Sequence, residues 1–426
     1  MTKPRDYIAL VDVNAFYVSA ERVFDPKLRN RPVVVLSNND GCCVALSPEA
    51  KALGIPLGEP WFKLAAQAPQ YGLVARSSNY ELYGDMSARV MRLLNQCSAW
   101  VEVYSIDEAF VGVRGTPQQL KAWGHQVKER IWQELGLPVC VGIAPTKTLA
   151  KLANKTAKKI PVLAGVCCWE AVPVQRREAL LASLPVIEVW GIAVRLTKRL
   201  YAMGIESIAQ LRDADPAAMR KRFSIVVMRT VLELRGTPCI PLEEEPAEIK
   251  DQLIFSRSFS EKITTVAEME QVLGVYAQRA SARLHKHDRQ AKVVTAWAMT
   301  SHYSPDQHGP SATVTLPAPT ADPVLLTRAA KALLPRIHEG VRYARAGIVV
   351  TDLYKTGHQP VFDLFTDRHE ERQIGPLIES VRQKINGAAI GLGRAGLKAG
   401  PQWQMRREMM SPRYTTHWDE LPLVKA

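Results

Sequence analysis

The chain has 426 residues, of which 47% are hydrophobic, and it carries a formal charge of +13 at pH 7. This length exceeds one ordinary domain and predicts several hydrophobic cores. The charge predicts attraction to a polyanion, and nucleic acid fits better than a membrane because the sequence has no basic amphipathic anchor and no long apolar span. A basic protein without such a partner is the alternative.

The N-terminus and the cysteines both predict a cytoplasmic protein. No apolar signal core precedes the first predicted strand. Cys42-Cys43 and Cys167-Cys168 are adjacent pairs without the two-residue gap of a zinc knuckle. We therefore expect buried thiols at these positions and not metal ligands.

The first 170 residues alternate strand-like runs with helix-like stretches, which predicts an α/β domain. In chain order these elements follow the βαββαβ pattern of a split, mixed sheet. The predicted strands are 8–13, 32–37, 101–105, 109–113 and 138–144, and the predicted helices are 15–24, 79–97, 117–135 and 146–159.

Three carboxylates stand at the ends of predicted strands in this region. Asp12 ends the first strand, and the adjacent Asp107 and Glu108 lie between the apolar runs 100–103 and 109–113. Side chains alternate along a strand, so Asp107 and Glu108 face opposite ways unless the hairpin bends between them, where both would reach one cation. The pattern predicts a magnesium site. A single acid here is more often a turn former or a helix cap, and Asp12 would then cap the helix 15–24.

Residues 184–200 predict two helices joined by a turn that contains Gly191. This arrangement is typical of a helix-hairpin-helix, in which backbone N–H groups at the turn and at the next helix N-terminus bind a DNA phosphate. Arg195, Lys198 and Arg199 would assist that contact. The alternative is an ordinary αα-hairpin with a solvated basic face.

A second βαββαβ unit follows the acidic stretch 243–246. Its predicted elements are a strand at 252–259, a helix at 265–285, strands at 291–299 and 312–316, a helix at 323–338 and a strand at 346–353. His285 and His287 lie two residues apart on a helix and point apart, so we expect a solvated face and not a metal site. From Lys355 onward the mixture of Gly, Pro, Gln and Arg predicts an irregular tail.

Two motifs, Asp-Val-Asn-Ala-Phe-Tyr at 12–17 and Tyr-Ser-Ile-Asp-Glu-Ala-Phe at 104–110, resemble the catalytic core of the Y-family DNA polymerases. The segments 37–42, 77–83, 146–154 and 411–416 are similar to the UmuC-type subfamily, that of the catalytic subunit of DNA polymerase V. The resemblance implies an α+β multidomain fold with a palm, small fingers, a helical thumb and a little finger. The implied boundaries are palm 1–16 and 77–170, fingers 17–76, thumb 171–242, linker 243–250, little finger 251–355, and a partner-binding C-terminal tail 356–426.

The resemblance also implies a catalytic site with two Mg²⁺ ions. Asp12 and Asp107 would bridge both ions, Glu108 would complete the site of the ion that activates the primer hydroxyl, and the Val13 carbonyl would bind the nucleotide-side ion. The two ions would neutralise the negative charge that develops during phosphoryl transfer.

The implied nucleotide site involves Phe16, Tyr17, Lys51 and Lys158. Tyr17 matches the steric gate whose ring fills the space of a ribose 2′-OH, and Lys158 matches the triphosphate-binding lysine. Lys51 stands where many relatives have an arginine. A lysine gives a point charge but cannot bind a phosphate through two parallel hydrogen bonds as a guanidinium does. Pro48 replaces a fingers tyrosine common in the family.

Further residues are implied to bind DNA and a sliding clamp. The implied DNA-binding residues of the thumb are Gly191, Arg195, Lys198 and Arg199, and those of the little finger are Ser256, Arg257 and Ser258. Ala193 replaces the second glycine that is usual in the family. Asp363, Leu364 and Phe365 end a peptide similar to the clamp-docking motif, with Val361 in place of its leading Gln. An edge strand at 361–365 is the alternative.

The function implied by the resemblance is error-prone, DNA-templated translesion synthesis in the SOS response to DNA damage. Damaged primer–template DNA and dNTPs would be substrates, and a cleaved UmuD-type dimer, a RecA filament and the sliding clamp would be partners, with no membrane involved. The alternatives are a palm-fold nucleotidyl cyclase, a catalytically idle DNA-bound accessory factor, and a bare helix-hairpin-helix module. The last leaves the carboxylate-bearing half unexplained.

Overall fold

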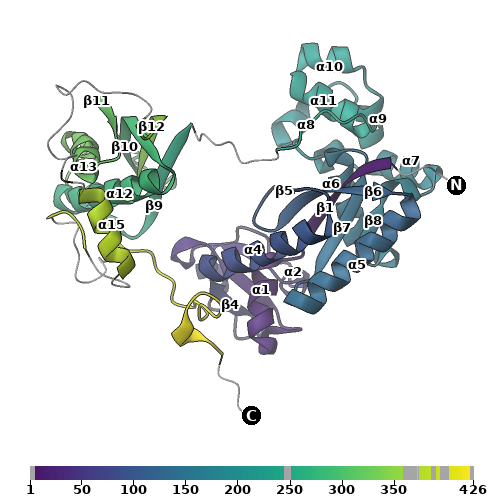
Figure 1. The fold of residues 1–426 in the computed structure, drawn as a ribbon, viewed down its shortest axis with the longest axis horizontal. Coiled ribbons are helices and arrows are strands. Elements are labelled where there is room, and N and C mark those ends of the chain that lie inside the picture. The colour runs from purple at the N-terminus through teal and green to yellow at the C-terminus, as the bar shows by residue number, and fades with distance from the viewer. Residues whose placement is uncertain are drawn as a thin grey trace. The chain divides into compact units, whose positions relative to one another are not determined.

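A computed structural model describes residues 5–243, 251–357, 372, 374–384, 390–393 and 403–422. The chain forms two compact units (Figure 1). Unit 1 comprises Met1–Ser37, Gly41–Pro246 and Met409–Ala426, and unit 2 comprises Asn38–Asp40 and Ala247–Glu408. Among the described residues, no helix is long and apolar enough to cross a membrane.

The centre of unit 1 is a five-stranded sheet in the order β5-β6-β1-β7-β8. β1 runs antiparallel to β6 and to β7, whereas β7 and β8 are parallel. Valine is the most frequent residue in these strands, as expected where both faces of a sheet are covered. The strands are β1 (Arg5–Val13), β5 (Val101–Val103), β6 (Glu108–Gly115), β7 (Val139–Ala144) and β8 (Val166–Cys168).

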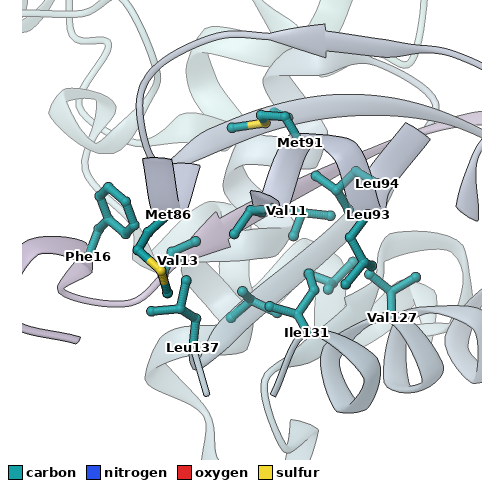
Figure 2. Packing of buried hydrophobic residues seen from close by; sticks show 14 of the residues in the cluster. Val11, Val13, Phe16, Met86, Met91, Leu93, Leu94, Val127, Ile131 and Leu137 are labelled. Carbon is teal, nitrogen blue, oxygen red and sulfur yellow. The ribbon is translucent and has the colours of Figure 1, made fainter. Parts of the chain in front are cut away.

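Helices cover the two faces of this sheet and bury alternate residues of β1. Val11 and Val13 belong to a core shared with α4 (Tyr80–Cys97) and α5 (Pro117–Leu135), whereas Leu10 belongs to a core shared with α6 (Lys147–Lys159). Figure 2 shows Val11 and Val13 surrounded by side chains such as Met86, Leu94 and Ile131. The period of two therefore assigns odd residues of β1 to one face and even residues, Asp12 included, to the other.

Close packing between β7 and α6 leaves no room for a side chain at Gly142. A Cβ atom at Gly142 would lie 2.1 Å from the Asn154 nitrogen and 2.3 Å from the Ala150 oxygen, both in the backbone of α6. We expect Gly142→Ala to lower the free energy of unfolding by about 1–3 kcal/mol or more, because neither backbone can yield cheaply. Thermal denaturation checks this result. Gly84→Ala is the matched control: its site on α4 is exposed and open, so it should stabilise by about 0.5–1 kcal/mol.

A smaller sheet of three strands lies in the region expected to form the fingers. β2 (Val33–Leu36) pairs antiparallel with β3 (Cys43–Leu46) and parallel with β4 (Val74–Ser77). Only β2 was predicted, because β3 and β4 have four residues each and too little pattern to separate them from loops. The helices of this region are α1 (Phe16–Phe24), α2 (Pro48–Ala52) and α3 (Trp61–Leu64).

Five short helices follow the main sheet, and Glu233 joins them to the helix α6 that packs on it. The Glu233 carboxylate accepts hydrogen bonds from the backbone nitrogens of Thr148 (3.0 Å) and Cys239 (2.7 Å), and its carbonyl accepts one from Thr146 Oγ1 (2.9 Å). This buried side chain thus joins the helices to the start of α6. They are α7 (Val174–Ser183), α8 (Val194–Tyr201), α9 (Ile208–Asp213), α10 (Pro216–Arg222) and α11 (Ile225–Leu234).

Unit 2 has the predicted βαββαβ order around a four-stranded antiparallel sheet, β11-β10-β12-β9. His285, Lys286 and His287 are exposed, as expected. The expected helix 323–338 is wrong in extent: it ends at Ala330 and continues as a 3₁₀ helix, Lys331–Arg336, which contains Pro335. The elements are β9 (Gln252–Ile263), α12 (Val266–Lys286), β10 (Arg289–Thr300), β11 (Ser311–Thr320), α13 (Pro323–Ala330), β12 (Tyr343–Lys355) and α15 (Ile374–Lys384).

Candidate active site

Antiparallel pairing of β1 with β6 sets Asp12 directly opposite Glu108. Residues opposite each other in such a pair project from the same face, so both carboxylates lie on the α6 side of the sheet. Asp107 lies in the bend just before β6. Asp12 and Glu108 line a cavity of about 390 Å³, and Asp107 lines a neighbouring one of about 550 Å³.

Ser105 holds the turn between β5 and β6. Its hydroxyl donates to Asp107 Oδ1 at 2.6 Å and accepts from the Glu108 backbone nitrogen at 3.1 Å. The Asp107 carbonyl accepts a hydrogen bond from the Val13 nitrogen at 2.9 Å, which ties the turn to the end of β1. These hydrogen bonds thus hold the turn from which the hairpin presents both adjacent acids.

Two lysines of α6 contact the carboxylates of the smaller cavity. Lys158 Nζ lies 2.5 Å from Asp12 Oδ1, and Lys151 Nζ lies 2.5 Å from Glu108 Oε2. Burial raises the pKa of Asp12 to about 7; Lys158 lowers this pKa, and the neighbouring Glu108 raises it. The attraction of Lys158 therefore lowers the pKa of Asp12 by less than burial raises it.

Sequence reasoning assigned a role to Lys158 but missed Lys151. Lys151 also lies 4.1 Å from the centre of the Tyr104 ring and 5.3 Å from that of Trp190, a geometry that favours a cation. The signal was present in the spacing: 151, 155 and 158 are i, i+4 and i+7 on one helix, so they share a face. That face lines the cavity with Asp12 and Glu108.

The carboxylates suit a hard divalent cation by their chemistry. Asp12 and Glu108 are adjacent oxygen donors, and the raised pKa of Asp12 reflects burial of a negative charge that a nearby cation would stabilise. In the described part of the chain, no three Asp, Glu, His or Cys side chains are grouped as a ready metal site. Asp107, next to Glu108 in the chain, lines the neighbouring cavity.

The larger cavity contains the residues predicted to bind a nucleotide, except Lys158. Phe16, Tyr17 and Lys51 line it together with Asp107, and its volume of about 550 Å³ lies in the range of small-molecule sites. The Tyr17 ring stacks on the Tyr83 ring, with centroids 4.5 Å apart and planes at 14°. Burial raises the pKa of Tyr17, so its phenol stays neutral at pH 7. Pro48 occupies the first turn of α2, where Ser47 caps the helix.

The turn around Gly191 agrees in part with the predicted helix-hairpin-helix. Gly191 has a positive φ of 83°, and Gly191, Arg195, Lys198 and Arg199 are all exposed. The expected first helix is wrong in extent, since only a 3₁₀ turn, Val186–Glu188, precedes the glycine; Pro185 stands just before it. Arg199 donates to the Arg222 carbonyl at 3.1 Å, whereas Arg195 and Lys198 extend from α8.

The predicted template-contacting residues lie on β9, an edge strand of unit 2. Arg257 lies 4.7 Å from the centre of the Phe255 ring, and Ser256 Oγ accepts a hydrogen bond from Arg345 at 3.0 Å. Ser258 is exposed beside them. Arg345 was not predicted, because it lies on β12, far from Ser258 in the sequence. The two residues are neighbours only through the pairing of β12 with β9. Asp363, Leu364 and Phe365 lie outside the described residues.

Known proteins are similar to this chain along almost its whole length. Residues 11–155 match the impB/mucB/samB family, residues 250–362 match its C-terminal domain, and residues 373–424 match a domain of unknown function, DUF4113. Protein ImpB of Salmonella typhimurium is 42% identical over 424 residues, covering 98% of this chain and 99% of that protein. Protein UmuC of S. typhimurium strain LT2 is 43% identical over 426 residues, covering 98% and 100%.

Solved structures with the same fold are polymerases. A chimera of the Y-family DNA polymerases Dbh and Dpo4 has a TM-score of 0.63 at 22% identity and covers 82% of this chain and 100% of that one. An insertion ternary complex of Dbh DNA polymerase has a TM-score of 0.52 at 21% identity, with the same coverage. The likeness to these relatives, together with the shared fold, shows that the chain is a DNA-directed DNA polymerase. The chain belongs to the UmuC-type subfamily of the Y-family translesion polymerases, whose members generally depend on metal ions.

Proposed function

We propose that this chain extends a primer 3′-OH with dNTPs on damaged template DNA, as the error-prone polymerase of an SOS response. The observation that supports this most directly is the pairing of Asp12 with Glu108 next to a cavity that holds Asp107 and Tyr17. A carboxylate site and a nucleotide-sized cavity then share one hairpin, as phosphoryl transfer requires.

Asp12, Asp107, Glu108 and the Val13 carbonyl would hold two Mg²⁺ ions. When bound, these ions neutralise negative charge on the transferred phosphoryl group and on both the attacking and the leaving oxygen. The protein's own contribution is to keep the acids on a rigid hairpin: Ser105 fixes Asp107, and the β1–β6 register fixes Asp12 against Glu108. Lys158, which pairs with Asp12 here, would donate to the triphosphate of a bound dNTP.

Nucleotide selection would occur in the larger cavity. Phe16 and Tyr17 would pack beside the sugar, and the Tyr17 ring would exclude a 2′-OH. Lys51 would supply a point charge toward the phosphates without the bidentate geometry of an arginine. The stacked contact with Tyr83 supports this role because it gives Tyr17 a fixed neighbour.

Primer–template DNA would be held by backbone contacts that carry no sequence information. In the thumb, the exposed Gly191 turn and the side chains of Arg195, Lys198 and Arg199 would bind a phosphate. In the little finger, Ser256, Arg257 and Ser258 would contact the template strand. The net charge of +13 supports attraction to the DNA polyanion.

The proposed partners are a cleaved UmuD-type dimer, a RecA filament and the sliding clamp, with the complex working in the cytoplasm. The likeness to UmuC over the full length of that protein supports the first two. The peptide ending in Asp363, Leu364 and Phe365 supports the third. The tail 356–426 would carry these contacts.

Changing Leu364 and Phe365 together to Ala should remove stimulation by the sliding clamp. Each side chain buried in an apolar groove contributes about 1.5–3 kcal/mol, so docking should weaken by orders of magnitude. A titration of primer extension against the clamp measures this. Basal extension without the clamp should be unchanged; a loss of basal activity or folding would favour a buried strand at 361–365.

Primer extension on undamaged and abasic templates, with and without a UmuD-type partner, tests the proposed function. Template-directed extension with Mg²⁺ is expected. Formation of a cyclic nucleotide from ATP or GTP, without extension, would instead indicate a nucleotidyl cyclase. That alternative is not favoured, because a cyclase needs neither the thumb nor the second βαββαβ unit, both of which the chain shares with its relatives. An idle accessory factor is disfavoured by the intact acids.

A further inference from the structure

The last part of the chain is joined to the small sheet of unit 1. We call residues 409–416 the C-terminal strap. The Ser77 nitrogen donates to the Met409 carbonyl at 3.1 Å, the Met409 nitrogen donates to Ser77 Oγ at 2.9 Å, and Met410 forms a parallel bridge with Ser77. The strap therefore adds backbone pairing to β4, an edge strand of that sheet.

Asn79 fixes the next residues of the strap. Its Nδ2 donates to the carbonyls of Ser411 and Pro412, each at 3.1 Å, and to Ser411 Oγ at 3.0 Å. Its Oδ1 accepts from the Leu82 nitrogen and caps α4. Asn79 is 1% exposed and Ser411 is 6% exposed, so these bonds form in the interior of unit 1. Because Asn79 both caps α4 and binds Ser411 and Pro412, it fixes the position of the strap relative to α4.

The buried carboxylate of Glu21 connects the strap to an aromatic ring. Ser411 Oγ donates to Glu21 Oε1 at 3.0 Å, and Tyr83 OH donates to the same oxygen at 2.7 Å. Glu21 is fully buried; burial raises its pKa, whereas the bonds from Tyr83 and Ser411 lower it. A buried carboxylate needs its hydrogen bonds, so losing either hydroxyl would leave this one poorly compensated.

Tyr83 carries this connection into the larger cavity, because its ring is stacked on Tyr17 at 4.5 Å. The hydroxyl of Tyr83 is anchored by Glu21, and its ring face supports Tyr17, which lines the cavity. Tyr414 of the strap stacks on Phe24 of α1 at 4.9 Å and so binds the helix that carries both Tyr17 and Glu21.

We propose that Ser411 is a positioning residue for nucleotide selection: through Glu21 and Tyr83 it fixes the ring of Tyr17 and thereby sharpens the discrimination against ribonucleotides. The proposal rests on the proposed sugar gate at Tyr17. It gives the end of the DUF4113 match a role within the catalytic unit itself.

Single-nucleotide insertion by the full chain, measured separately with a dNTP and the matching rNTP, tests the proposal. Ser411→Ala and Tyr83→Phe should each raise the ratio of rNTP to dNTP kcat/KM on the order of 3- to 10-fold, the effect of one lost hydrogen bond. The larger part should appear in KM, because the ring that shapes the cavity loses its support. Thr416→Ala removes an exposed hydroxyl from the same strap and should leave the ratio unchanged.

A shared pathway makes the effects non-additive. The double variant Ser411→Ala/Tyr83→Phe should change the ratio by less than the product of the single effects, since both hydroxyls act on one oxygen of Glu21. In a Tyr17→Ala background, Ser411→Ala should have no further effect on the ratio. Ser411→Thr, which keeps the hydroxyl, should restore the wild-type ratio.

The outcomes separate this proposal from the sugar gate. If Tyr17→Ala raises the ratio but Ser411→Ala and Tyr83→Phe leave it at the wild-type value, the positioning role is overturned and the gate stands. A lower melting temperature with an unchanged ratio would have the same meaning. Should Ser411→Ala fail to fold, Tyr83→Phe decides alone. If Tyr17→Ala itself leaves the ratio unchanged, the gate is wrong, and the role of the strap falls with it.

Discussion

Asp107→Asn is expected to reduce primer extension on the order of a thousandfold or more while leaving the fold and the affinity for DNA nearly unchanged. The substitution removes one of the negative charges that would hold the metal ions, and a loss of about 4 kcal/mol of transition-state stabilisation corresponds to this factor. The Asn side chain still offers an oxygen to Ser105 Oγ, so the turn should keep its hydrogen bond. Single-turnover insertion kinetics, with DNA affinity measured in parallel, provide the test.

Asp6→Asn is the matched control for that experiment. Asp6 lies near the other end of β1, where its side chain is 87% exposed. Its Oδ1 lies 3.7 Å from Nε of the exposed Arg114. The substitution makes the same chemical change far from both cavities and should leave extension at the wild-type rate. An Asp107→Asn variant that extends primers as fast as this control would exclude Asp107 from the catalytic site.

Tyr17→Ala is expected to raise incorporation of ribonucleotides relative to deoxyribonucleotides on the order of 10- to 200-fold, the range that one missing group in a pocket produces. Removing the ring opens space in the cavity it shares with Phe16 and Asp107. Tyr17→Phe keeps the ring and its stack on Tyr83, so discrimination should persist in that variant. Equal discrimination in wild type and Tyr17→Ala would remove Tyr17 from the sugar site.

Regular elements with a clear period were predictable from the sequence. Both βαββαβ orders are confirmed, and the helix 117–135 has the expected bounds because Thr116 caps its start and Gly136 ends it. The short strands β3 and β4 were missed, since four residues carry almost no periodic signal. The helix predicted over 323–338 was too long because its apolar spacing continues through Pro335.

The residue types of the candidate site can be read from the sequence, whereas the cavities that these residues line follow from the fold. Three acids at strand ends predict one cluster; in the structure Asp12 and Glu108 line one cavity, and Asp107 lines a neighbouring one. The sequence placed Lys151 within the segment 146–154 but gave no indication that it contacts Glu108. The strap contact is less accessible still: Glu21 and Ser411 are 390 residues apart, and no local pattern in the sequence reports such a pairing.

Insertion of a single dNTP opposite an abasic site is the measurement that tests the central claim most directly. With a primer–template, Mg²⁺ and a UmuD-type partner, the wild-type chain should add one nucleotide to the primer, and Asp107→Asn should add none in the same time. Equal insertion by both proteins, or the absence of insertion by a folded, DNA-bound wild type, would contradict the assignment of a translesion polymerase site to Asp12, Asp107 and Glu108.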